Sequence, residues 1–265
     1  MARLPKRRPR FLTVKTAYHL SPNLIRVTFA GPELEGFPKG HHGANCKLVL
    51  PRDGESRAEF EAYFAPDAPK EKIHAVRTYT VRAYREDSQE LDIDFVAHGD
   101  NGPATRWAQA AKPGSFLGFM GPSQPKLTEF YADWYLLAAD LSAMPVVEAT
   151  LEALPSDAKG LAVFEVPTEE DIRDIAAPAG IELRWLVQPE QHRASMAQVD
   201  LVKSLDWPSG TVQTCIAGES SVIRALRDHL HNERQVPKRD TYISGYWKIG
   251  LVEDEHQKMK RAEAA

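Results

Sequence analysis

The segment Arg77-Thr78-Tyr79-Thr80-Val81-Arg82 groups residue types that can hold a phosphorylated aromatic cofactor. An arginine can neutralise a pyrophosphate, a tyrosine ring can cover a flavin or a ribose, and a threonine hydroxyl can hydrogen-bond the edge of a flavin ring. Alternate residues of a strand point the same way, which would gather such groups on one face. By itself, the segment also fits an amphipathic strand with two exposed arginines.

The segment from Asp94 to Ala108 (DFVAHGDNGPATRWA) leads from a strand through a glycine-rich turn into a helix. Such a turn presents unpaired amides at a helix N-terminus, a favourable position for a pyrophosphate. Taken singly, His98 also fits a histidine that bonds within the turn. Trp107 is expected to be a core residue of the helix rather than a stacking partner of a ligand.

The segment Asp140-Leu141-Ser142-Ala143-Met144-Pro145 lies where a strand passes into a helix, the usual position for the phosphates of a dinucleotide. It has no GxGxxG motif, and Asp140 or Ser142 would serve equally well as a helix cap. Glu165, near the end of the next strand, could hydrogen-bond a ribose 2′-hydroxyl and so favour NADH over NADPH, although a surface carboxylate explains it equally well. Glu219 precedes a further helix, where a carboxylate is favourable without any ligand.

The hydrophobic period of the chain changes after Gly121-Pro122. Before this point, alternation such as that of residues 24–30 predicts short antiparallel strands; after it, apolar strands alternate with helices, which predicts a parallel sheet covered by helices. We therefore predict an α/β protein of two domains. The first is a six-stranded antiparallel β-barrel over residues 1–125, and the second is a parallel-sheet α/β domain over residues 126–265.

The expected elements can be given by residue number. Strands are expected at 11–17, 24–30, 45–50, 77–83, 91–95 and 115–119, and then at 135–139, 161–166, 181–187, 212–217 and 241–244. Helices are expected at 145–154, 169–175, 196–205 and 222–232. Residues 51–76 are expected to form an irregular flap, and residues 253–261 a charged helix or a frayed end.

Composition excludes several classes of protein. With 33 basic and 37 acidic side chains in 265 residues, the net charge of −4 argues against nucleic-acid binding, and the basic arm Arg3–Arg10 fits a solvated segment. No apolar run of about 18 residues and no secretory signal is visible, so we expect a cytoplasmic protein without a membrane span. Cys46 and Cys215 form no CxxC pair, which favours reduced thiols and no structural metal. The absence of GxSxG and P-loop motifs argues against hydrolases and kinases.

Six segments, in this order, resemble the siderophore-interacting proteins, also called ferric-siderophore reductases, of the ferredoxin-reductase-like superfamily. They are RTYTVR, HGDNGPATRWA, GFMGP (Gly118–Pro122), AADLSAMPVVEATLEAL (Ala138–Leu154), AGESSVIRALR (Ala217–Arg227) and GYWKIG (Gly245–Gly250). Together they span almost the whole chain. Leu141 departs from the family pattern, which commonly has an acidic residue there, and this leaves the electron donor open.

The resemblance implies a bound FAD and a nicotinamide co-substrate. Arg77, Tyr79 and Thr80 would hold the isoalloxazine and ribityl parts, and the turn before the helix would surround the pyrophosphate. The full set implied for FAD is Arg77, Tyr79, Thr80, Val81, Arg82, Asp94, Val96, His98, Gly102, Pro103, Ala104 and Thr105. The set implied for NADH or NADPH is Asp140, Ser142, Ala143 and Glu219.

The function implied by the resemblance is the reduction of ferric siderophores in the cytoplasm by a monomer. Hydride would pass from NADH or NADPH to FAD, and single electrons from the flavin to Fe(III), so no protein nucleophile is needed. Anionic ferric complexes call for a basic face, and the resemblance places Lys47 and Lys248 there, although either also fits a solvated lysine. Two alternatives remain: the same enzyme with reduced ferredoxin as donor, and a non-catalytic cytosolic siderophore-binding protein.

Overall fold

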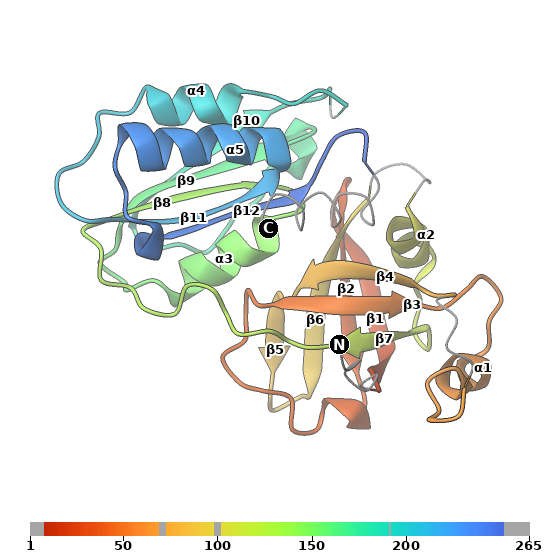
Figure 1. Cartoon of the computed structure of the whole chain (residues 1–265). Coiled ribbons are helices and arrows are strands. Elements are labelled where there is room, and N and C mark those ends of the chain that lie inside the picture. The colour runs from red at the N-terminus through yellow and green to blue at the C-terminus, as the bar shows by residue number, and fades with distance from the viewer. Residues whose placement is uncertain (1–7, 69–72, 98–101, 191, 252–265) are drawn as a thin grey trace. The chain divides into compact units, whose positions relative to one another are not determined.

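The computed structural model of the chain describes residues 8–68, 73–97, 102–190 and 192–251 (Figure 1). The chain divides into two compact units, residues 1–125 and 126–265. Among the described residues, no helix has both the length and the apolar character needed to cross a bilayer.

The first unit is built on an antiparallel sheet of seven strands in the order β4-β3-β7-β1-β2-β6-β5 (Figure 1). The strands are β1 (Arg10–Ser21), β2 (Leu24–Ala30), β3 (Asn45–Leu50), β4 (Ala75–Thr80), β5 (Ala83–Arg85), β6 (Glu90–Val96) and β7 (Phe116–Met120). Ile25, Val27 and Phe29 of β2 point into the core of this unit, together with Leu91, Ile93 and Phe95 of β6. The alternating pattern of residues 24–30 and 91–95 is thereby confirmed.

Val81 and Arg82 divide the segment that was predicted as one strand over residues 77–83. The Val81 N–H donates to the Ala44 carbonyl at 2.9 Å, beside β3, whereas the Arg82 N–H donates to the Asp92 carbonyl of β6 at 3.0 Å. The backbone therefore exchanges one partner strand for another, and the two edge strands of the sheet, β4 and β5, are joined directly by the chain. The antiparallel architecture of the first domain is confirmed, but the count of six strands is wrong because this segment supplies two. The described sheet is open, with β4 and β5 as its edges.

The connection from β3 to β4 contains a helix, α1 (Arg57–Ala62), so the prediction of an irregular flap over residues 51–76 is wrong in this part. Ser56 and Glu59 form a capping box at its start, each side chain accepting a hydrogen bond from the backbone of the other, and Phe60 is buried. The Ser-x-x-Glu spacing that signals such a helix is visible in the sequence. A second helix, α2 (Pro103–Ala110), follows β6.

The second unit contains a parallel sheet of five strands in the order β10-β9-β8-β11-β12, which confirms the predicted α/β domain. The strands are β8 (Trp134–Asp140), β9 (Lys159–Val166), β10 (Gly180–Val187), β11 (Val212–Glu219) and β12 (Thr241–Trp247). From the central β8 the chain proceeds to one side of the sheet and then crosses to the other. The switch point of the sheet therefore lies between the carboxyl ends of β8 and β11, where α/β folds bind ligands.

Helices cover both faces of this sheet. α3 (Met144–Ala153) lies on one face, and α4 (Ala197–Lys203) and α5 (Ser220–Asp228) lie on the other (Figure 1). α5 runs on into a π-helical turn, His229–Glu233, which accounts for the predicted helix over residues 222–232. The helix expected at 169–175 is wrong: only the 3-10 turn Glu169–Asp171 forms, and the backbone becomes extended at Ile172. The prediction for residues 253–261 falls outside the described part of the chain.

Candidate functional site

The motif predicted to hold a flavin is distributed over two faces of β4. Arg77 and Tyr79 lie opposite Leu48 and Cys46 of β3, on the side that carries the barrel core, while Thr78 and Thr80 lie on the other side. The strand thus presents cationic and aromatic groups on one face and hydroxyl groups on the other.

Val81 ends this motif in the barrel core. Its side chain is fully buried, its N–H donates to Ala44, and its carbonyl accepts from the N–H of Gly43 at 2.8 Å. These contacts give Val81 a structural role in shaping the motif. Arg82, the next residue, is also buried.

A row of aromatic rings connects β4 with α2. The Tyr79 ring lies 4.5 Å from that of Phe95, and the Phe95 ring lies 5.6 Å from that of Trp107. Trp107 also stacks on Phe29, with ring centroids 6.0 Å apart. The two segments predicted to hold FAD, one on β4 and one at the start of α2, therefore pack against the same core. The expectation that Trp107 is a core residue is confirmed.

The N-terminus of α2 is suited to an anionic ligand. Its cap residue, Gly102, makes no side-chain capping bond, Pro103 occupies the first turn, and that turn carries no acidic residue among the residues described. The first amides of such a helix carry partial positive charge and lack helical partners. Thr105 does not add to this site through its hydroxyl, which donates to the Val96 carbonyl at 3.1 Å and ties the helix to β6. His98 lies outside the described residues.

Asp94, also predicted at the flavin site, forms an ion pair. Both its carboxylate oxygens accept from Arg26 of β2, each at 2.7 Å, and its side chain is buried. A bidentate pair of this kind fixes the register of β2 against β6. Asp94 thus has a structural role through Arg26, and its place at the flavin site stays a prediction.

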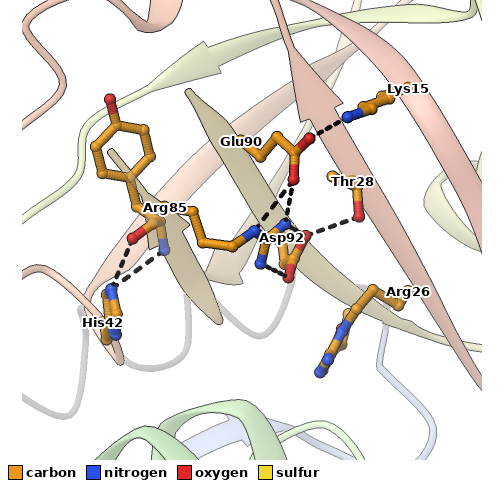
Figure 2. Close-up of polar contacts among 9 residues, drawn as sticks. Lys15, Arg26, Thr28, His42, Arg85, Glu90 and Asp92 are labelled. Carbon is orange, nitrogen blue, oxygen red and sulfur yellow. Dashed lines mark hydrogen bonds and ion pairs between the residues drawn. The ribbon is translucent and has the colours of Figure 1, made fainter. Parts of the chain in front are cut away.

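A polar network lies next to this pair on β1, β2, β5 and β6 (Figure 2). Asp92 accepts from Thr28 at 2.8 Å and from both terminal nitrogens of Arg85 at 2.5 and 2.8 Å. Arg85 also contacts Glu90, which in turn pairs with Lys15. Although burial opposes ionisation, the hydrogen bonds from Arg85 and Thr28 hold the pKa of Asp92 below its usual value. The network is a structural clamp on the short β5 strand.

These groups fit FAD. The aromatic and cationic side chains of β4 match the ring and the phosphates of such a cofactor, and the first amides of α2, which no described side chain caps, match the phosphates. The remaining polar groups, Asp94 and Asp92 among them, are satisfied by protein partners.

In the second unit, Asp140, Ser142 and Ala143 lie together at the carboxyl end of β8. The Asp140 Oδ1 atom accepts from the N–H of Ser142 at 2.9 Å, from its hydroxyl at 2.6 Å and from the N–H of Ala143 at 3.3 Å. Burial raises the pKa of Asp140, and these hydrogen bonds oppose the shift. Asp140 thus stabilises the turn that leads into α3. The cap residue of α3 is Ala143, with no side-chain capping bond, so the alternative that Asp140 or Ser142 caps this helix is not realised.

Glu219 lies across the switch point, at the carboxyl end of β11. Its Oε2 atom caps α5 by accepting from the N–H groups of Ser221 at 2.6 Å and Val222 at 3.2 Å. Its Oε1 atom accepts from the N–H of Ile249 at 3.3 Å. The structure therefore brings Asp140 and Glu219 to the same edge of the sheet, each with its carboxylate engaged by the protein.

Two residues at this edge were not in the predicted set. Trp247, at the end of β12, donates its indole N–H to the Oδ2 atom of Asp140 at 2.7 Å. Glu165, weighed above as a ribose ligand, lies next to Asp140 in the sheet. Its Oε2 atom is buried and has no hydrogen-bond partner among the described residues, and burial raises its pKa to about 7.

The lysines expected at a substrate face lie in different units. Lys47 on β3 donates to the hydroxyl of Thr78 on β4. Lys248 follows β12, and its carbonyl accepts from the N–H of Leu251 at 3.1 Å. Both are half-buried.

The thiols of Cys46 and Cys215 are free and buried, as expected. Burial raises the pKa of both and that of Cys215 to about 12, so neither is a nucleophile at neutral pH.

Comparison with known proteins gives matches to both halves of the chain. Residues 13–126 match the siderophore-interacting FAD-binding domain, and residues 132–250 match the siderophore-interacting protein model. A protein named ferric vibriobactin reductase ViuB, from Vibrio cholerae, is 38% identical over 251 residues, covering 93% of this chain and 92% of that protein.

Solved structures agree with this similarity. The siderophore-interacting protein SipS from Aeromonas hydrophila superposes with a TM-score of 0.83 at 34% identity, over 97% of this chain and 98% of that one. The ferredoxin-NADP+ reductase of Plasmodium falciparum superposes with a TM-score of 0.60 at 12% identity, over 90% and 96%. This last likeness shows the shared fold alone.

Proposed function

Because the chain belongs to the siderophore-interacting protein family, we propose that it is a flavin-dependent ferric-siderophore reductase. The observation that carries this proposal is the similarity, over nearly the full length of both chains, to a protein named as a ferric vibriobactin reductase. Bound FAD supplies the required chemistry, since it takes up two electrons and gives them to Fe(III) one at a time.

In this proposal the first unit holds the flavin. Arg77, Tyr79 and Thr80 position its ring and ribityl chain, and the amides at the start of α2 bind its pyrophosphate. Arg82 lies beside the cofactor or the substrate. Val81 and Asp94 support this arrangement through the core and the Arg26 ion pair.

The substrate in this proposal is an anionic ferric siderophore. Siderophores hold Fe(III) through hard, anionic oxygens, and lowering the charge of the metal makes it softer and loosens the complex. Lys47 and Lys248 attract the complex electrostatically, since each adds a positive charge. We place the reaction in the cytoplasm and assign it to a monomer.

The electron donor is assigned to the switch point of the second unit. Asp140, Ser142, Ala143 and Glu219 form the edge against which NADH or NADPH binds. The carboxylate of Glu165, with one oxygen unpartnered in the described structure, suits a ribose hydroxyl better than a 2′-phosphate, and this favours NADH. Reduced ferredoxin remains the alternative donor because Leu141 departs from the family pattern.

The test has two parts. The purified protein is expected to be yellow and to release intact FAD on heating. Mixed anaerobically with NADH, NADPH or reduced ferredoxin, its flavin absorbance is expected to fall, and to recover on addition of a ferric siderophore. A protein that binds ferric siderophore but retains no flavin, even when FAD is added, would instead be a siderophore carrier.

A further inference from the structure

The indole of Trp247 lies across the switch point of the parallel sheet. β12 neighbours β11, and β11 neighbours β8, so a side chain that reaches from the end of β12 to Asp140 must pass the end of β11. Gly218 leaves room there: a Cβ atom on it would lie 2.7 Å from the Asp140 Oδ2 atom. Trp247 therefore crosses the crevice in which folds of this kind bind nucleotides.

Three hydrogen bonds hold this segment, Trp247–Ile249, in place. The indole N–H donates to Asp140 at 2.7 Å, the Trp247 carbonyl accepts from the Ser220 hydroxyl at 2.8 Å, and the Ile249 N–H donates to Glu219 at 3.3 Å. We call Trp247–Ile249 the closing segment. Its anchors are the ends of β8 and β11 and the start of α5, which border the switch point.

The bond to Asp140 is the contact most sensitive to a ligand. Asp140 is a desolvated carboxyl group, and its Oδ2 atom has the indole as a donor while Oδ1 is held by the turn before α3. Losing the indole would leave an acceptor atom of this half-buried residue without its donor, which is costly unless another donor replaces it. Trp247 is 36% exposed, so the ring can leave this position without crossing the core.

We propose that Trp247 controls access of the electron donor: a pyridine nucleotide enters the switch point by displacing the indole from Asp140. The carboxamide and the ribose hydroxyls of such a nucleotide are hydrogen-bond donors that can satisfy the Oδ2 atom in place of the indole. This inference rests on the proposed function, because it assumes that the donor is a nucleotide.

A closed segment lowers the apparent affinity for the nucleotide. The observed dissociation constant is the intrinsic one divided by the fraction of molecules that are open, so weakening the closed state tightens binding. Trp247→Phe keeps an aromatic ring but removes the N–H. We expect it to lower the dissociation constant roughly tenfold, the equivalent of one hydrogen bond to a charged group.

The experiment is titration calorimetry of the flavin-loaded protein with NAD+ and with NADP+, which bind without reducing the flavin. Trp247→Phe is compared with wild type and with the control variant Trp207→Phe. Trp207 precedes β11, so it lies near the amino end of that strand, away from the switch point. Ser220→Ala removes the hydrogen bond to the Trp247 carbonyl. It should also lower the dissociation constant of the nucleotide, but by less than Trp247→Phe does. It also serves as a second variant if Trp247→Phe folds poorly.

Unchanged or weaker binding in both anchor variants would overturn the proposal; weaker binding would mean that Trp247 holds the nucleotide. Absence of nucleotide binding to every variant would also overturn it. The proposed function is tested separately with photoreduced wild-type protein, whose electrons reach a ferric siderophore without any nucleotide. Failure of the proposed role of Trp247 and failure of the proposed reductase function therefore give different results.

Discussion

Glu165 and Asp140 lie side by side at the carboxyl ends of β9 and β8, as Cα partners in the parallel ladder. Burial raises the pKa of both, and Asp140 adds to the shift at Glu165, because two neighbouring carboxylates disfavour each other's charge. The Glu165 carboxyl group is therefore partly protonated near neutral pH.

Glu165 should make stability depend on pH. Its folded-state pKa of about 7 lies above its ordinary value, so between the two values the folded state binds more protons and stability falls as pH rises. We expect Glu165→Gln to have a higher melting temperature than wild type at pH 8, with the difference disappearing near pH 5. The exposed Glu170→Gln serves as control in thermal unfolding. A constant difference across this range would contradict the assignment.

Asp92 is expected to stabilise the first unit through its bonds to Arg85 and Thr28. Asp92→Asn should lower the free energy of unfolding by roughly 1–3 kcal/mol at pH 7, since it weakens hydrogen bonds to a buried charge. The lowered pKa of Asp92 means that its contribution is present above its ordinary pKa and is lost as pH falls through the folded-state value. Urea unfolding at pH 7 and below about pH 4 measures both effects.

The exposed Asp87→Asn is the matched control for this experiment. A wild-type advantage that persists undiminished in acid would show that Asp92 stabilises the unit by packing and not by charge.

Local sequence signals predicted the strands closely, because alternation of apolar residues is a property of neighbouring positions. β2 and β3 begin and end at the predicted residues. The Ser56–Glu59 capping box is a local signal of the same kind, and it marks the start of α1. The break at Val81 was not predictable in this way, since it depends on which strands lie on either side.

Contacts at the candidate sites were predicted less well, because they join residues that are far apart in the sequence. Trp247 and Asp140 are 107 residues apart and Arg26 and Asp94 are 68 apart, so only the strand order brings each pair together. The sequence indicated correctly that Asp140 and Glu219 follow strands. It could not show that Asp140 accepts from Trp247, or that Glu219 accepts from Ile249 and from the start of α5.

Arg77→Ala should weaken flavin retention more than it weakens folding. Arg77 is half-buried, so replacing it should cost less folding free energy than replacing a fully buried core residue, whereas its charge would be lost to a phosphorylated cofactor. We expect the ratio of flavin to protein absorbance to fall by half or more after dialysis, with a melting temperature of the flavin-free protein close to that of wild type. Arg8→Ala, which removes an exposed ion pair with Glu33, is the control. Unfolding of the Arg77 variant would mark this residue as structural.

Lys47→Ala combined with Lys248→Ala should raise the apparent KM for anionic ferric siderophores. An ion pair in contact with solvent contributes only about 0 to 1 kcal/mol. With two such contacts removed, we expect KM to change by several-fold, and by less at high salt. A neutral ferric hydroxamate should respond less, and Lys159→Ala, at the amino end of β9, should leave KM unaltered. An equal loss toward neutral and anionic complexes at every salt concentration would exclude these lysines from the substrate face.

The most direct measurement of the reductase function follows electrons to the iron. The flavin-loaded protein is photoreduced without oxygen and mixed with excess ferric siderophore in the presence of a chelator that colours with Fe(II). We predict recovery of the oxidised flavin spectrum and about two Fe(II) for each flavin, because a fully reduced flavin holds two electrons and each Fe(III) accepts one. A flavin that stays reduced, with no Fe(II) formed, would contradict the assignment of this protein as a ferric-siderophore reductase.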